Sequence, residues 1–307
     1  LRHNPPVYRN LHISNKVGFE TNTVINSNLG KTGLGIDISK VFLVSNNLND
    51  HNRTVITGFF EQRMEFNNFD LTPGIAISSY SDFGIKAFPG LDVGFRVSEK
   101  FKVYGNFGYT YRVPTFTDLY YVGPNTQGNS EIEPESALSE EIGFRYTNKQ
   151  FSFDIAFFNR KSENLIDWTK DSQDAKWEAR NFSEVITNGF ETNLNYRFVV
   201  GSNIQNLKLS YSFVNDKIKD NNVAFTRYSL NSLKHQLSLV FDWKFNQIFS
   251  QQIAYRYIER TNGEKYNVLD TKLLAKINEQ LKMSISVNNL FNTEYTETYL
   301  VPMPKGN

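Results

Sequence analysis

The stretch from residue 101 to residue 146 decides the fold. It reads FKVYGNFGYTYR at 101–112, VPTFTDLYYVGPNTQGNSEIEPESA at 113–137 and LSEEIGFRY at 138–146. In the first segment apolar Val103 and Phe107 alternate with polar Lys102 and Asn106. Because successive side chains of a strand point to opposite faces, the two flanking segments predict strands with one apolar and one polar face. The Gly, Pro and Asn residues between them predict a long loop with turns.

The same alternation recurs along the whole chain. It predicts strands over residues 12–26, 33–45, 53–66, 69–80, 87–97, 101–112, 138–147, 150–166, 182–199, 204–215, 227–244, 247–260, 266–277 and 280–291. These strands are longer than the about five or six residues of an average strand and suit a tilted membrane span. Short turns such as Asn67-Asn68 alternate with longer connections such as 113–137 and 167–181, which is typical of outer-membrane barrels.

The alternation also predicts what each face contacts. We expect the apolar face to contact lipid through Phe153, Phe157, Leu209, Leu239, Phe241 and Ile285. We expect the polar face to line the barrel lumen through Asp154, Lys208, Asp242 and Lys282. Aromatic residues stand beside the short turns and again toward the long loops, as in the two aromatic girdles of a membrane barrel.

Composition excludes several classes of protein. The 307 residues include 26 Phe, 16 Tyr and 3 Trp, an aromatic share of 15% that suits strands and membrane interfaces. The net charge of +1 gives no electrostatic argument for nucleic acid as a partner. Cysteine is absent, which excludes a disulfide framework and a thiolate metal site. No run of about 18 apolar residues occurs, so a transmembrane helix is not predicted, whereas alternating membrane strands remain compatible with the sequence.

A large soluble β protein is the alternative fold. A sandwich would show similar alternation, but no repeat of the length of a propeller blade is visible, and an up-and-down barrel closes its own edges. We therefore predict an all-β, transmembrane, antiparallel up-and-down β-barrel. The chain begins at Leu1 without Met or a signal segment and ends at Asn307 without a closing strand, so we interpret residues 1–307 as an internal part of one barrel domain.

Three segments resemble motifs of TonB-dependent outer-membrane receptors. Residues 111–121, YRVPTFTDLYY, resemble the FRAP-x-F-x-x-LY box of that family, and residues 128–135, GNSEIEPE, resemble its GNPxLxPE box. Residues 287–295, VNNLFNTEY, are similar to the family's V-x-NLFN-x-x-Y segment. The matching positions are Arg112, Pro114, Leu119, Tyr120, Asn129, Pro134, Glu135, Asn289, Leu290, Phe291 and Asn292.

The resemblance implies a bacterial outer-membrane receptor and no enzyme. Such a barrel has about 22 strands around a plug, so about eight strands, the plug and the TonB-contacting segment would lie outside this chain. The implied function is uptake of a scarce, bulky nutrient, cobalamin or an iron–siderophore chelate, energised by the TonB-ExbB-ExbD complex. Its surroundings would be outer-membrane lipid and lipopolysaccharide, and no resident cofactor is implied. Two other functions stay open, namely a surface adhesin or phage and colicin receptor without transport, and a glycan importer of the same superfamily.

The longest connections are the predicted ligand site. We expect Tyr120, Tyr121, Trp168 and Trp177 to contact the ligand and Arg180 to serve as a charge partner, because pockets for bulky ligands combine aromatic rings with a few polar groups. In the alternative interpretation these aromatic residues brace the loops against each other.

Other polar groups have simpler interpretations. Arg112 is expected to form a rim salt bridge with Glu140 or Glu141 at the start of the next strand. The loop with Asn46, Asn49 and Asp50 is rich in oxygen ligands, which suits calcium, although an ordinary solvated loop explains it as well. The four histidines form no spaced pair on one strand face, which argues against a metal enzyme. Haem receptors of the family that this chain resembles often carry a histidine between the two boxes, and residues 113–129 contain none, which argues against haem as cargo.

Overall fold

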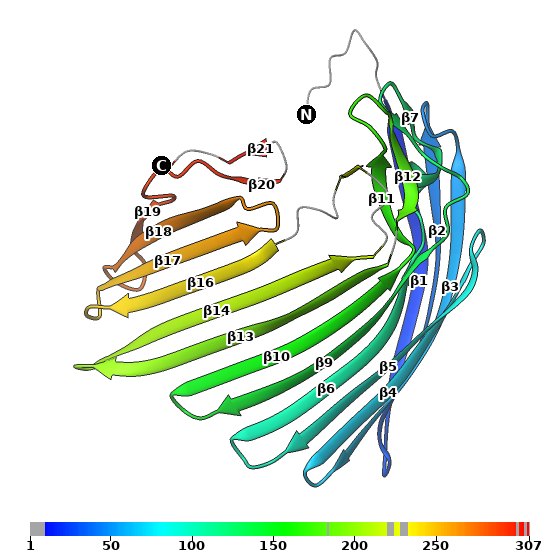
Figure 1. The fold of residues 1–307 in the computed structure, drawn as a ribbon. Helices are drawn as coiled ribbons and strands as arrows, with labels where there is room; N and C mark the ends of the chain where they lie inside the picture. Colours follow the sequence, from blue (N-terminus) through cyan, green and yellow to red (C-terminus); the bar gives the residue numbers. More distant parts are fainter. Residues whose placement is uncertain are drawn as a thin grey trace.

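The computed structural model describes residues 10–182, 184–219, 224–227, 233–298, 301–303 and 306. Its main feature is a curved antiparallel sheet of fourteen strands, which we call the wall (Figure 1). Its strands are β1 (His12–Ser27), β2 (Gly30–Ser45), β3 (His51–Phe66), β4 (Phe69–Tyr80), β5 (Gly84–Arg96), β6 (Phe101–Arg112), β9 (Glu135–Thr147), β10 (Phe151–Glu163), β13 (Val185–Val200), β14 (Asn203–Ile218), β16 (Leu233–Lys244), β17 (Phe249–Arg260), β18 (Lys265–Lys276) and β19 (Lys282–Val287).

Each wall strand pairs with the next wall strand along the chain. The order runs from β1 to β19 without a crossover, which confirms the up-and-down arrangement predicted from the alternation. Within the described part of the chain, β1 and β19 have a neighbour on one side only, so the wall is an open sheet. Most predicted strand boundaries lie within three residues of the observed ones.

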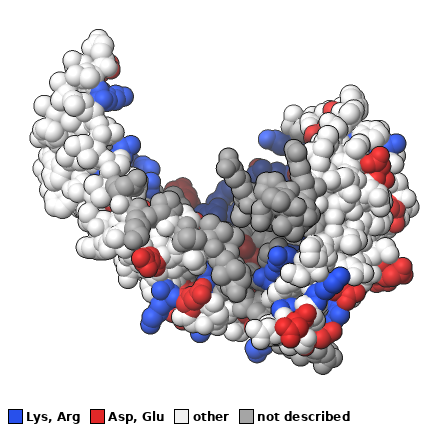
Figure 2. Space-filling model, turned by 90° about the horizontal axis from the view of Figure 1, so that it is seen from above, with Lys and Arg blue, Asp and Glu red and all other residues white. Residues whose placement is uncertain are grey.

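The cross-strand register confirms the two faces of the wall. Phe153, Leu194, Leu209 and Leu239 lie opposite one another across β10, β13, β14 and β16. On the other face Asp154 accepts a hydrogen bond from Arg145, and Lys208 approaches Asp242 to 4.0 Å. Seen from above, the molecule is an open shell, and the charged side chains of its left arm gather along the concave edge (Figure 2).

Asparagine closes several of the short turns in the same way. The Oδ1 atom of Asn148 accepts hydrogen bonds from the backbone N–H groups of Gln150 and Phe151, at 2.8 and 2.7 Å. Asn246 and Asn278 make the corresponding pairs of bonds in the β16–β17 and β18–β19 turns. Such side chains replace backbone partners in tight turns. These turns all lie at one end of the wall, and the long connections lie at the other (Figure 1).

The long connections, which were predicted as loops with turns, form a second folded unit that we call the cap. It contains α1 (Phe116–Tyr120) and the strands β7 (Val122–Gly123), β8 (Thr126–Gln127), β11 (Leu165–Lys170), β12 (Trp177–Phe182) and β15 (Phe225–Thr226). The five strands form one sheet in the order β15-β11-β12-β8-β7. The strand predicted over 150–166 is wrong at its end, because Asn164 adopts a φ of 53° and the chain turns from the wall into β11 there.

The C-terminal part departs from the prediction at one point. The strand predicted over 280–291 ends at Val287, because Asn289 and Asn292 adopt a φ of 52°. Beyond it, β20 (Thr296–Thr298) pairs with β21 (Val301–Pro302).

Residues 228–232 of the strand predicted over 227–244 lie outside the described residues, and the observed β16 begins at Leu233. Among the residues that the structure describes, no helix is long and apolar enough to cross a membrane.

Candidate ligand-binding cap

The helix α1 is fixed at its start by Thr115 and Asp118. The Thr115 hydroxyl accepts a hydrogen bond from the Asp118 backbone N–H at 3.1 Å, and the Asp118 carboxylate accepts one from the Thr115 N–H at 3.0 Å. This capping box satisfies two N–H groups that have no partner inside the helix. Pro114 precedes it and is buried, and Leu119 is only 5% exposed. The first family-like box therefore encodes the start of a helix followed by a buried residue, Leu119, that packs in the core.

The second family-like box closes the same helix. The N–H of Gly128 donates to the carbonyl of Tyr121 at 2.6 Å, and the N–H of Asn129 donates to the carbonyl of Asp118 at 2.9 Å. A Cβ atom at position 128 would lie 2.8 Å from the backbone nitrogens of Tyr120 and Tyr121, a distance that carbon atoms do not tolerate. Only glycine fits, so the box carries the chain back against the end of α1.

The cap has a hydrophobic core of its own. Its buried residues are Leu119, Ile132, Ile166, Trp168 and Ala179, with Phe83, Tyr120, Tyr121 and Trp177 packed against them. Trp168 is 7% exposed, and the Tyr121 ring meets it edge to face with ring centres 6.5 Å apart. Tyr120 stacks on His51 of β3 with ring centres 3.8 Å apart. Four of the five predicted ligand residues thus lie together and brace the cap, while their contact with a ligand remains a prediction.

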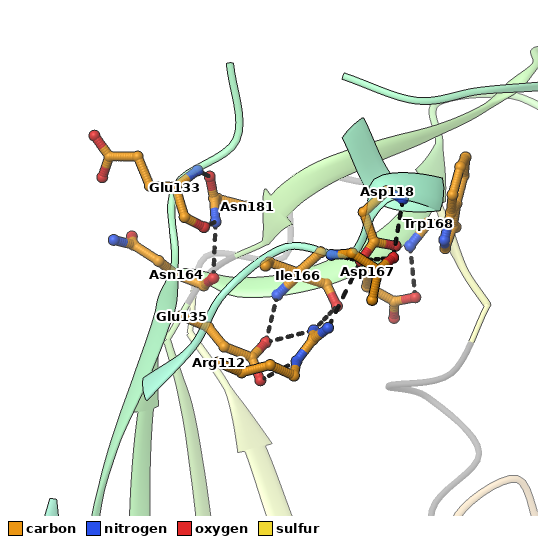
Figure 3. A network of polar contacts seen from close by, with 10 residues as sticks. Arg112, Asp118, Glu133, Glu135, Asn164, Ile166, Asp167, Trp168 and Asn181 are labelled. Carbon is orange, nitrogen blue, oxygen red and sulfur yellow. Dashed lines mark hydrogen bonds and ion pairs between the residues drawn. The ribbon is translucent and has the colours of Figure 1, made fainter. Parts of the chain in front are cut away.

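Arg112 joins the wall to the cap (Figure 3). Its guanidinium donates to both carboxylate oxygens of Glu135, at 2.7 and 2.8 Å, and to the carbonyl of Ile166 at 3.2 Å. The Glu135 carboxylate also accepts the N–H of Ile166 at 2.8 Å, and Asp118 lies 3.7 Å from the guanidinium. We call Arg112, Glu135, Asp118 and the Ile166 backbone the clasp.

The clasp corrects one prediction from the sequence. Arg112 forms a rim salt bridge as expected, but its partner is Glu135 and not Glu140 or Glu141. The reason is register, because β9 begins at Glu135, three residues before the predicted strand, and Glu135 stands directly opposite Arg112. Glu141 instead accepts a hydrogen bond from Asn106 at 3.1 Å.

The side chain of Asn181, on β12, forms hydrogen bonds with two other segments of the cap. Its side-chain amide donates to the carbonyls of Glu133 and Asn164, both at 2.9 Å, and its oxygen accepts the N–H of Glu133 at 2.8 Å (Figure 3). One side chain thus connects β12 with the segment before β9 and with the turn after β10. Together with the clasp, it fixes the two long connections to each other.

Arg180, the predicted charge partner, is already paired. Its guanidinium lies 3.0 Å from Asp171 and 2.6 Å from Glu178. The hydrogen bonds with Asp171, and then those with Glu178, raise the pKa of Arg180 above its ordinary value. Arg180 therefore remains a cation at every physiological pH, and its charge is balanced within the cap.

Metal ligands do not cluster in the part of the chain that the structure describes, where no group of three or more His, Asp or Glu side chains could hold an ion. In the loop predicted to suit calcium, Asn46 accepts the N–H of Leu11 at 2.9 Å and Asp50 accepts the N–H of Ser45 at 3.2 Å. These oxygen atoms accept hydrogen bonds from backbone groups of the loop and its neighbour, and the calcium hypothesis remains untested.

Near the C-terminus, the side chain of buried Asn289 donates to the carbonyl of Thr293 and accepts from its N–H, so the third family-like motif encodes a turn.

The sequence did not single out a group of cations and rings on the cap sheet. The Lys170 Nζ atom lies 5.1 Å from the centre of the Trp177 ring and 5.0 Å from that of Phe225. The guanidinium carbon of Arg227 lies 5.7 Å from the Trp177 ring centre. These residues come from three separate strands or their ends, so only the pairing of β11 with β12 and β15 brings them together.

The comparisons with known proteins agree with this architecture. The TonB dependent receptor-like β-barrel family matches residues 6–290. The chain belongs to the TonB-dependent receptor family. Its relatives include the vitamin B12 transporter BtuB of Vibrio vulnificus, which is 23% identical over 253 residues, and the ferrienterobactin receptor of Escherichia coli, which is 21% identical over 239 residues. These alignments cover 80% and 68% of this chain, but 38% and 30% of the relatives.

Solved structures of this receptor family share the fold. The siderophore receptor PirA of Acinetobacter baumannii superposes with a TM-score of 0.77 at 13% identity and covers 97% of this chain. A mutant of the ferric enterobactin receptor PfeA of Pseudomonas aeruginosa gives 0.75 at 15% identity and covers 92%. The chain spans 54% and 49% of these two structures. By its family membership, the chain is an outer-membrane β-barrel protein.

Proposed function

We propose that the intact receptor imports a metal chelate or corrinoid across the outer membrane with energy from the TonB complex, and that the cap captures the ligand. The family membership supports receptor function, and the relatives include both a vitamin B12 transporter and siderophore receptors. No catalytic constellation is required, because the reaction is binding and translocation.

The observation that carries this proposal is the folded cap. Long loops carry binding sites when a rigid scaffold positions them. Here α1, β11 and β12 share a buried core that includes Trp168 and Ala179, and the clasp fixes this unit to the rim of the wall. The exposed parts of the unit combine aromatic rings with charged groups, as ligand pockets do.

The direct test is uptake by cells whose only receptor for these nutrients is the intact protein. Cells deleted for their own cobalamin and siderophore receptors would receive radiolabelled cyanocobalamin, ferric enterobactin or a ferric hydroxamate. We expect accumulation of at least one of these compounds, and loss of that accumulation when TonB is deleted.

A TonB-deletion strain separates transport from binding. Surface binding that persists without TonB, together with loss of accumulation, supports energised import. If cells with and without the receptor bind and accumulate all three compounds equally, the proposal is wrong, and a surface adhesin becomes the better interpretation.

A further inference from the structure

We infer that an anionic iron chelate of the catecholate type, whose iron ligands are oxygen atoms carried on aryl rings, binds on the cap sheet at Lys170, Trp177, Phe225 and Arg227. This inference rests on the proposed receptor function and names the class of ligand. It selects the aryl chelate over a corrinoid. It also assigns the main ligand contacts to residues other than Tyr120, Tyr121 and Arg180.

The four side chains belong to one face of the cap sheet. Lys170 stands opposite Phe225 in the pairing of β11 with β15, and the N–H of Arg227 donates to the carbonyl of Trp168 at 3.0 Å. Side chains two residues apart on a strand share a face. Trp168 and Lys170 therefore lie on the same face, buried at Trp168 and partly open at Lys170. The site thus extends the packed core of the cap toward solvent.

Among the residues that the structure describes, no carboxylate balances the charge of the site. Neither Lys170 nor Arg227 forms an ion pair with any acidic residue that the structure describes, and the Lys170 ammonium donates to the neutral carbonyl of Gln173 at 2.5 Å. Three other arginines of the cap and its rim are paired with carboxylates, namely Arg53 with Asp82, Arg112 with Glu135 and Arg180 with Asp171. An incoming anion would therefore meet two cations that need not first release a carboxylate.

The rings define the second property of the ligand. Phe225 is 40% exposed, and its ring and that of Trp177 flank the Lys170 ammonium at 5.0 and 5.1 Å. A cation next to aromatic faces retains its attraction for an anion, and the exposed part of the Phe225 ring offers flat apolar area for stacking. A deprotonated catechol combines a planar ring with oxyanions, so a ferric chelate of such groups matches both features. A neutral corrinoid lacks the charge that the two cations would pair with.

The test measures binding of ferric enterobactin and cyanocobalamin to the intact receptor in detergent. We expect ferric enterobactin to bind wild type more tightly, and binding to weaken about tenfold for Lys170→Gln and again for Arg227→Gln, since each removes a charge-assisted contact. The wild-type affinity should fall with added salt, and the double variant should lose most of that dependence. A role in cap folding alone would not change the salt dependence.

Two controls make the outcome decisive. Lys149→Gln removes an exposed charge in a short turn at the opposite end of the wall and should change neither affinity nor salt dependence. Trp177→Leu keeps an apolar side chain and should weaken the binding of ferric enterobactin by about tenfold, because it removes the ring over which Lys170 and Arg227 lie. The inference is overturned if wild type does not bind ferric enterobactin, or if the double variant binds it as wild type does with the same salt dependence. Uptake of another compound of the panel would in either case leave the receptor function intact.

Discussion

The wall and the cap are stabilised in opposite ways. The wall exposes large apolar side chains on its apolar face, with Ile285 at 69% and Phe19 at 65%, and its strands are held by a continuous backbone ladder. The cap instead buries Ala179 completely and Trp168 to 7% exposure, although its strands have only two to six residues. A membrane completes the burial of the wall, whereas the cap depends on packing between segments that are distant in sequence.

Substitution of one tryptophan in each region should give the largest difference in stability between the cap and the wall. Trp168→Ala removes a buried side chain from the cap core, and such changes cost about 3–5 kcal/mol. Trp243→Ala removes a tryptophan that is 42% exposed on the wall, and the loss should be much smaller. Limited proteolysis of the intact receptor in lipid should show early cleavage in the cap for Trp168→Ala alone. Equal protease resistance of both variants would show that the cap core contributes little.

A charge on the outer face should break the wall but spare the cap. Leu239 lies between Leu209 and Tyr255 on the apolar face, and Leu239→Arg near the bilayer midplane should cost about 2–4 kcal/mol. Ser238 is its neighbour on the polar face, so Ser238→Arg is the matched control. The free energy of unfolding in lipid vesicles measures both, and a larger loss for Ser238→Arg would mean that the two faces are assigned the wrong way round.

The wall was predictable from the sequence, and the cap was not. Alternation determines the wall locally, because every second side chain faces the same medium. The cap depends on pairing between β8, β11, β12 and β15, which local patterns do not encode. The error at Arg112 has the same origin. Ser136 and Ala137 interrupt the alternation, so the start of β9 at Glu135 was missed, and with it the clasp.

Glycine-to-alanine substitutions should show a smaller difference in stability between the cap and the wall. Gly128→Ala places a methyl group against the backbone at the end of α1, and such overpacking costs about 1–3 kcal/mol. Gly108→Ala in β6 meets no atom within 4 Å and should be close to neutral. Thermal unfolding of the intact receptor, followed by tryptophan fluorescence, compares the two. Equal shifts would contradict the close approach of residue 128 to α1.

The smallest expected effect is a pH dependence at the base of the cap. Glu184 lies 2.6 Å from Lys219 and 3.3 Å from Lys161, and the hydrogen bond from Lys219 is the main cause that lowers its pKa below the ordinary value of 4.5. A lowered pKa contributes stability above pH 4.5 that is lost as the pH falls through the lowered value. Local hydrogen exchange around Glu184, corrected for intrinsic rates, should therefore rise slightly in that acidic range.

Glu184→Gln serves as the control for this pH effect. The variant should show the faster exchange already at neutral pH and no further change on acidification. A wild-type protein whose exchange around Glu184 is insensitive to acid would indicate that these ion pairs are fully screened by solvent.

The most direct test of two separately stabilised regions is native-state hydrogen exchange of the intact receptor in lipid, for wild type and Glu135→Gln. The variant keeps the shape of the side chain but removes the charge that Arg112 and the Ile166 N–H contact. Since hydrogen bonds to charged groups contribute about 1.5–3 kcal/mol, the amides of Trp168 and Ala179 should exchange at least about tenfold faster. The amides of Phe153 and Leu209 in the wall should not change. Equal acceleration in wall and cap, or none in the cap, would contradict the account.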